Sequence, residues 1–224
     1  MPGPITVYAD TVNHYQAGGV GLTWSQIRDG GSAVVTGVGI NPTTARHFIV
    51  PDGLGGYTFM RTYLQFNLSV VTDPILSMRL YVNGVSGYTP GNTTYVGYAG
   101  NKNPLDNNSG DYGLYLVETS AIGGNELSTI VIQPETFTSC QLDITTYPPR
   151  DPLDYYKIAL VSEPDFLNTV DGTSGETRIH NSSGKIPYLI INGGYPNNVN
   201  GVAGASIVEV SDIAASSIVT IAGV

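Results

Sequence analysis

The side chains best suited to chemistry in this chain are three histidines, His14, His47 and His180. All three fall in predicted loops or at predicted strand ends, and no two are spaced like metal ligands in a His-x-x-x-His pair. A histidine near an arginine and a tyrosine could abstract a proton in a lyase-type reaction, which needs a base and a neutralised carboxylate. Nothing in the sequence brings such groups together. We therefore expect no catalytic residues, no metal site and no cofactor.

Arg61 and Cys140 are two further candidates, and each has a structural interpretation. Arg61 is predicted on the outward face of a strand, where it could bind the carboxylate of a substrate or of an acidic sugar. We favour a structural ion pair, or packing on aromatic rings across the strand. Cys140 alternates with Leu142 and Ile144 on the inward face of its predicted strand, which indicates a buried thiol and not a nucleophile.

The segment 106–111 reads Asp-Asn-Asn-Ser-Gly-Asp and offers oxygen ligands for Ca²⁺. Its spacing differs from that of a calcium loop, in which acidic residues alternate with others before a terminal Glu. An Asn/Gly turn without a metal is the better interpretation.

Fifteen tyrosines and a single tryptophan provide aromatic rings that could stack on a sugar. The candidate glycan-stacking residues are Trp24, Tyr88, Tyr95, Tyr98 and Tyr112. Tyrosine is also favoured in strands and interfaces, because its ring can be buried while its hydroxyl stays solvated. Sugar stacking and a structural role both remain open for this set.

The composition is low in charge. Charged residues make up 12% of the 224 residues, about half of the roughly 25% in an average domain, and the net charge is −9. Contact with phosphates needs clustered Lys and Arg, and the chain has nine in all. These numbers predict a polar, uncharged surface and no binding to nucleic acid.

One cysteine cannot form an intrachain disulfide, so nothing indicates an oxidising compartment. No charged and apolar leader follows Met1, and no apolar run reaches the roughly 18 residues of a membrane span. We expect a protein that is made in the cytoplasm without a signal peptide, and that does not bind membranes.

Short segments that alternate apolar and polar residues, separated by turn pairs with Gly, Asn or Pro, predict β-strands. In 75–82 the even-numbered residues are apolar and share one face, and this segment enters a predicted tight hairpin at Asn83-Gly84. In 57–68 the same alternation places Leu64 inward and Arg61 outward. The predicted strands are 5–8, 57–68, 75–82, 112–117, 127–133, 138–144, 155–161 and 186–191.

No segment before residue 200 sustains a 3.6-residue apolar period with caps, so we expect little helix. Eight or more short strands without a βαβ rhythm indicate an all-β antiparallel sandwich, and a jelly roll fits best. A Gly/Pro/Asn stretch at 193–198 predicts a linker between a body, residues 1–192, and a C-terminal arm, residues 199–224.

The arm carries an apolar eleven-residue repeat, in which 203–213 is followed at once by 214–224. Such a segment is too short to bury its own apolar face, so burial should come from the body or from another subunit. An eleven-residue period suits a right-handed helical coil, the density of Val and Ile suits short strands, and a chain end can also be disordered. We favour an ordered arm docked on a neighbouring chain. Its predicted partner-binding residues are Ile207, Val208, Val210, Ile213, Ile218, Val219, Ile221 and Val224.

Two consecutive motifs resemble a known family. Residues 61–69 read Arg-Thr-Tyr-Leu-Gln-Phe-Asn-Leu-Ser, and residues 75–82 read Ile-Leu-Ser-Met-Arg-Leu-Tyr-Val. With further motifs in the same order between residues 5 and 192, they resemble jelly-roll domains of the DNRLRE or disaggregatase-related type, which are similar to some carbohydrate-binding modules. The middle motif of that family is Arg-x-x-x-x-Phe-Asp-Leu/Thr-Ser. Because Asn67 stands where the family usually has Asp, the partner of Arg61 could instead be Asp143 or Glu176.

The family resemblance implies a non-catalytic module of surface proteins, of polysaccharide-active proteins or of tailed bacteriophages. The arm separately resembles short Ser-Ile-x-x-Val-x-Gly-Val repeats at the ends of phage structural proteins. We therefore expect a non-enzymatic virion structural protein, such as a capsid decoration, head-fibre or tail-associated protein, that assembles with itself or with other virion proteins. The alternative is a carbohydrate-binding adhesin module that recognises host or environmental polysaccharide.

Overall fold

The computed structural model describes residues 4–19, 21–28, 35–72, 75–88, 92–100, 105, 126–146, 148–149, 155–169, 173–193, 209–210 and 213–214. Tyr112, the 106–111 turn and the predicted strand 112–117 lie outside the described residues. So do six of the predicted partner-binding residues, Ile207, Val208, Ile218, Val219, Ile221 and Val224. In the part of the chain that is described, no helix has the length and apolar character needed to cross a membrane.

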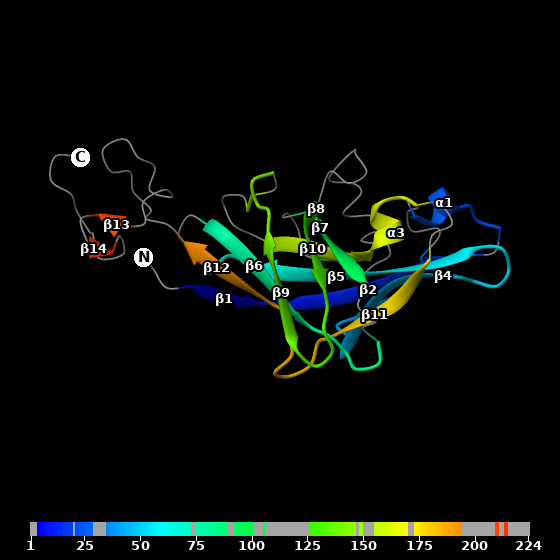
Figure 1. The fold of residues 1–224 in the computed structure, drawn as a ribbon, viewed down its shortest axis with the longest axis horizontal. Coiled ribbons are helices and arrows are strands. Elements are labelled where there is room, and N and C mark those ends of the chain that lie inside the picture. The colour runs from blue at the N-terminus through cyan, green and yellow to red at the C-terminus, as the bar shows by residue number, and fades with distance from the viewer. Residues whose placement is uncertain are drawn as a thin grey trace.

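Two antiparallel sheets form the body, which is the all-β sandwich expected from the sequence (Figure 1). The smaller sheet has the strand order β1 (Ile5–Tyr8), β12 (Tyr188–Gly193), β6 (Ile75–Asn83), β9 (Phe137–Leu142). The larger sheet has the order β11 (Ser174–His180), β4 (Thr44–Pro51), β5 (Tyr57–Asn67), β10 (Tyr155–Ser162), β7 (Thr93–Tyr98), β8 (Glu126–Val131). Also in the larger sheet, β2 (Thr11–Gly18) pairs with β5 and with β3 (Val35–Ile40).

The main core lies between the two sheets. The chain passes from one sheet to the other after β1, β5, β6, β8, β9 and β11, as in a jelly roll. Apolar side chains from both sheets meet in one buried cluster, for example Leu80 and Leu189 from the smaller sheet and Leu64 and Phe66 from the larger. Burial of this continuous apolar surface is the main force that holds the sheets together. The predicted inward positions of the 57–68 and 75–82 strands are confirmed at these residues.

The larger sheet is buried on its outer face as well. Two short helices, α1 (Trp24–Arg28) and α3 (Glu163–Phe166), lie at one end of the molecule, and a second apolar cluster joins them to β2, β5 and β10 (Figure 1). Every residue of β5 from Phe59 to Phe66 is buried. Arg61 lies on the outer face of β5, as predicted, but a second layer covers that face, so the side chain is buried.

The predicted hairpin at Asn83-Gly84 does not form. The neighbours of β6 are β12 and β9, and the next strand, β7, belongs to the larger sheet. Gly84 instead makes isolated bridges to Pro134 and Ile179. The Asn-Gly pair thus begins a crossover between sheets, because both edges of β6 are already taken by more distant strands.

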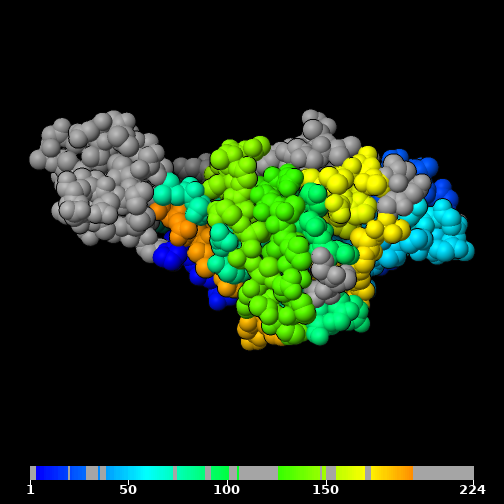
Figure 2. Space-filling view, viewed as in Figure 1, coloured from blue at the N-terminus to red at the C-terminus, as the bar shows by residue number. Residues whose placement is uncertain are grey.

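Strands β8 and β9 follow one another along the chain and lie at the edges of different sheets. Figure 2 shows their segment, in green, across the middle of one face, between β12 in orange and α3 in yellow. This segment closes one side of the sandwich, since β8 and β9 also contact each other.

The described part of the arm is a pair of very short strands. Strand β13 (Glu209–Val210) pairs antiparallel with β14 (Ile213–Ala214), with Val210 opposite Ile213. At these four residues the backbone is extended, as the strand interpretation of the repeat predicts, and a helical coil does not apply to them.

Candidate functional site

A buried ion-pair cluster joins Arg28, Arg61 and Asp165, and we call it the arginine cluster. Arg61 is fully buried on β5, and its Nε and Nη2 donate to the two carboxylate oxygens of Asp165, each at 2.7 Å. Arg28 Nε donates to the backbone carbonyl of Asp165 at 2.8 Å, and Arg61 Nη2 also donates to the carbonyl oxygen of Arg28 at 2.7 Å. Charge-assisted bonds of this bidentate kind fix geometry strongly, so the cluster ties α1 and α3 to the sheet.

The structural ion pair favoured by the sequence is confirmed, but its expected partners are wrong. Arg61 bonds Asp165, whereas Asp143 lies exposed after β9 and Glu176 lies on β11. The cause is α3, which follows β10 directly and carries Asp165 onto the outer face of β5. With both carboxylate oxygens of Asp165 bonded to it, Arg61 is not available to a ligand.

The larger sheet divides next to this cluster. One edge of β5 pairs with β4 along residues 57–60 and with β10 along residues 62–67, while β2 pairs along residues 58–65. Arg61 is the residue at which the partner changes. Strands β4 and β10 thus pair with successive parts of the same edge of β5 and diverge away from that edge. We call the space between these two strands the fork.

His47 of β4 lies at the fork. Ala45, two residues before it, packs in the core between the sheets, whereas Ile49, two residues after it, packs in the second cluster. Strand β4 therefore twists at His47. The imidazole is 1% exposed, and its Nε2 is hydrogen-bonded to Thr94 Oγ1 of β7 at 2.8 Å. Burial lowers the pKa of His47 from 6.5 to about 3, against the opposing effect of the Asp165 charge, so the ring is neutral at neutral pH.

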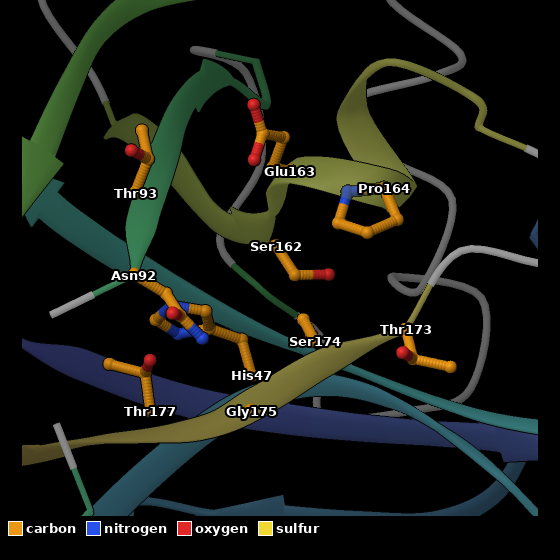
Figure 3. Close-up of a pocket in the computed structure, with 10 residues that line it drawn as sticks. All are labelled: His47, Asn92, Thr93, Ser162, Glu163, Pro164, Thr173, Ser174, Gly175 and Thr177. Atoms are coloured by element: carbon orange, nitrogen blue, oxygen red, sulfur yellow. The ribbon is translucent and has the colours of Figure 1, made fainter. Parts of the chain in front are cut away.

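A pocket of about 490 Å³ opens at the fork, within the roughly 300–1,000 Å³ range of small-molecule sites, and we call it the fork pocket (Figure 3). Its lining consists mainly of hydroxyl, amide and imidazole groups from β4, β7, β11 and the junction of β10 with α3. Among these lining residues Glu163 alone carries a formal charge. The lining residues are His47, Asn92, Thr93, Ser162, Glu163, Pro164, Thr173, Ser174, Gly175 and Thr177.

Ser162 occupies the N-cap position of α3 but makes no side-chain cap bond. In a capping box the N-cap serine bonds the backbone at N3 while an acidic or amide side chain at N3 reaches back. Here the N3 residue, Asp165, is held by the arginine cluster. Ser162 is 4% exposed, and neither its Oγ nor Nδ1 of His47 has a hydrogen-bond partner among the described residues. Two walls of the fork pocket thus carry unsatisfied buried polar atoms.

Comparison of the chain with known protein families and with curated proteins finds no match.

The predicted glycan-stacking residues do not share one surface. Trp24 is 7% exposed and packs edge-on against two aromatic rings of β5, and Tyr98 is 3% exposed and lies between the sheets. The prediction of sugar stacking is wrong for Trp24 and Tyr98, because neighbouring side chains cover both rings. Tyr88 is exposed, but an arginine guanidinium lies 3.7 Å from its ring centroid. Tyr95 stacks on an aromatic ring of α3 with the centroids 4.4 Å apart, and Tyr112 lies outside the described residues.

A different set of rings gathers on the outer face of the smaller sheet. Tyr8, Tyr188 and Tyr81 stand in one register row across β1, β12 and β6, and Phe137 of β9 contacts the Tyr188 ring. We call these four residues the aromatic row. The Tyr81 and Tyr188 rings stack face to face, with centroids 4.7 Å apart and planes 6° apart, and Tyr8 is 59% exposed. Alternation in 75–82 places Tyr81 on this face, but the sequence does not reveal that the two ends of the body pair.

Two of the three histidines do not lie where the sequence places them, and the third, His180, lies at a strand end as expected. His14 and His47 fall inside β2 and β4, and His180 ends β11. Burial, together with the positive charges of two nearby arginines, lowers the pKa of His14 to about 4. His180 Nε2 lies 3.2 Å from a carboxylate oxygen of Glu135 at the surface. The three imidazoles thus occupy three different surroundings.

Cys140 is a free, buried thiol in the core between the sheets, as the alternation predicts. Burial raises the pKa of this thiol, which keeps it protonated and unreactive. Over the described residues, no group of three or more His, Cys, Asp and Glu side chains is arranged to hold a metal ion.

Proposed function

We propose that the protein is a non-enzymatic structural protein of a tailed-bacteriophage particle, anchored to copies of itself or to other virion proteins by residues 199–224. A capsid decoration, a head fibre and a tail-associated protein all fit this role. The proposal is supported by the low-charge β-sandwich body, by the ordered motifs that resemble phage and surface modules, and by the apolar repeat of the arm.

The observation that best supports anchoring through the arm is the pairing of β13 with β14. Strands β13 and β14 have two residues each, and within the described residues they pair only with each other. A two-stranded ribbon is marginally stable at best in water, and one this short needs another surface to pack on. Full burial of a large apolar side chain contributes about 1.5–3 kcal/mol, so burial of about half of each of the eight predicted partner-binding side chains would supply at least several kcal/mol before ordering costs.

The aromatic row supports protein contact on the opposite side of the smaller sheet from the core. Tyrosine and phenylalanine are enriched in interfaces because they bury a large area with few rotatable bonds. Tyr81 and Tyr188 cover each other's faces and so present ring edges and hydroxyls. A protein surface can pack on such edges, whereas a pyranose ring stacks on an open ring face.

Deletion of residues 199–224 tests the proposal. We expect a folded monomer with an unchanged melting temperature, because the described part of the arm pairs with no strand of the body. The full chain should sediment as an assembly. A full-length control that carries Ile207→Asn and Ile218→Asn should behave like the deletion, because it keeps the length of the arm and loses its apolar groups. An unchanged oligomer mass, or retained incorporation into particles, would contradict the proposal.

Polysaccharide recognition by the same face is the second candidate, and one observation favours it. The Tyr8 ring is open to solvent, and the neighbouring register row holds Arg79 and Gln141, whose side chains can bond sugar hydroxyls. Glycan-array binding that is lost in Tyr8→Ala while the sedimentation mass stays the same would support this candidate. Array binding that Tyr8→Ala leaves intact would exclude it for this face.

A further inference from the structure

The fork pocket is lined by residues of the body, and its walls are unlike those of a packing defect. Empty cavities in proteins are usually apolar, whereas polar cavities hold partners that satisfy their walls. Here Ser162 Oγ and His47 Nδ1 are buried and lack a partner among the described residues. Figure 3 shows His47, Asn92 and Thr177 gathered on one side of the pocket, and Ser162 and Glu163 at the start of α3.

The charges of the lining limit what can bind. Neither Lys nor Arg is among the described residues that line the pocket, and the carboxylate of Glu163 would repel a phosphate or a carboxylate ligand. A large apolar ligand is also a poor fit, because most lining groups are polar and would lose hydrogen bonds to water. What remains is a neutral ligand that is polar over most of its surface.

Hydroxyl groups match the hydrogen-bonding groups of the described lining in kind. A sugar hydroxyl both donates and accepts, as do the side-chain hydroxyls of Ser162 and Thr177. The neutral His47 imidazole has one nitrogen engaged by Thr94 and one without a partner in the described part of the chain. The Glu163 carboxylate accepts only, and a polyol can donate two hydrogen bonds to it.

We infer that the fork pocket binds a neutral polyhydroxylated small molecule, of the size of one or two sugar residues, through Ser162, Thr177 and Glu163. The site is distinct from the aromatic row, since the row lies on the smaller sheet and the pocket on the larger. The inference also does not depend on the arm. Ligand binding in the fork pocket and assembly through the arm can therefore be tested separately.

The test is saturation-transfer NMR on the full chain with D-glucose, D-galactose, D-mannose and D-glucuronate, each in excess. We expect saturation transfer to at least one of the neutral sugars and none to glucuronate. Ser162→Ala and Thr177→Val should each weaken binding about fivefold, the effect of losing one hydrogen bond. Glu163→Gln should admit glucuronate, because the repelling charge is gone.

Two readouts separate binding from folding and from assembly. Ser162→Ala removes a hydroxyl without a partner among the described residues, so its melting temperature should not fall while its binding weakens. Tyr8→Ala is the matched control on the other sheet and should leave monosaccharide binding unchanged. Absence of transfer to all three neutral sugars, which would mean a pocket filled by water only, overturns the inference. Equal binding by wild type and by the Ser162→Ala and Thr177→Val variants also overturns it.

Discussion

Replacing Asp165 with asparagine is expected to lower the free energy of unfolding by about 3–5 kcal/mol. The substitution keeps the shape of the side chain but removes the charge that faces Arg61 and Arg28, both of which are at most 2% exposed. Two buried guanidinium groups would then lose the carboxylate charge that they share. Urea unfolding followed by the fluorescence of Trp24 measures the effect, since Trp24 donates a hydrogen bond to Asn168 just after α3.

Glu176→Gln is the matched control for this prediction. Glu176 also faces two arginines, Arg46 at 3.4 Å and Arg178 at 2.8 Å, but it is 26% exposed. Water screens such partly exposed pairs, so its loss should cost about 0–1 kcal/mol. If Asp165→Asn costs no more than Glu176→Gln, the arginine cluster does not organise this end of the fold.

Acid should destabilise the protein through His47. Its pKa is about 3 in the folded state against 6.5 for the free side chain, so below pH 6.5 the unfolded chain binds a proton that the folded chain does not. The stability from the buried neutral ring is complete above pH 6.5 and falls as the pH drops towards 3. The loss amounts to about 2 kcal/mol at pH 5 and about 4 kcal/mol at pH 3.

His47→Gln should remove most of this pH dependence, although the variant will be less stable at neutral pH. The quantity to compare is the slope of unfolding free energy against pH between 6.5 and 4, which should be shallower than wild type by up to about 1.4 kcal/mol per pH unit. His14 contributes in the same direction, because its pKa is lowered to about 4. Equal slopes for wild type and His47→Gln would show that His47 is not buried in its neutral form.

The strands of the smaller sheet were predictable because each has one apolar face and one polar face. The 75–82 strand and the 5–8 strand follow that rule and match β6 and β1 closely. Strands β4 and β11 escaped prediction because His47 and Thr177, which face each other in register, occupy buried positions that the rule reserves for apolar residues. Strands β4 and β11 thus could not be predicted from the sequence because they carry polar residues that line the fork pocket.

The sites depend on contacts between residues far apart in the chain. Arg61 and Asp165 are separated by 104 residues, and Asp165 reaches β5 only because α3 folds back after β10. The second layer had one visible signal, since Phe59 and Tyr63 put large aromatic rings on the face of β5 predicted to be outward. The aromatic row required the pairing of β1 with β12, which no local pattern reveals.

The claim that the arm anchors the protein to another chain is tested most directly by photo-crosslinking in the intact assembly. A photoreactive residue placed at Ile218, with a second preparation carrying it at Val210, would be irradiated in assemblies mixed from ordinary and ¹⁵N-labelled chains. Mass spectrometry of the crosslinked peptides then separates contacts within one chain from contacts between chains. We predict crosslinks that join the arm to a second copy or to another virion protein. Crosslinks confined to the body of the same chain would contradict the account.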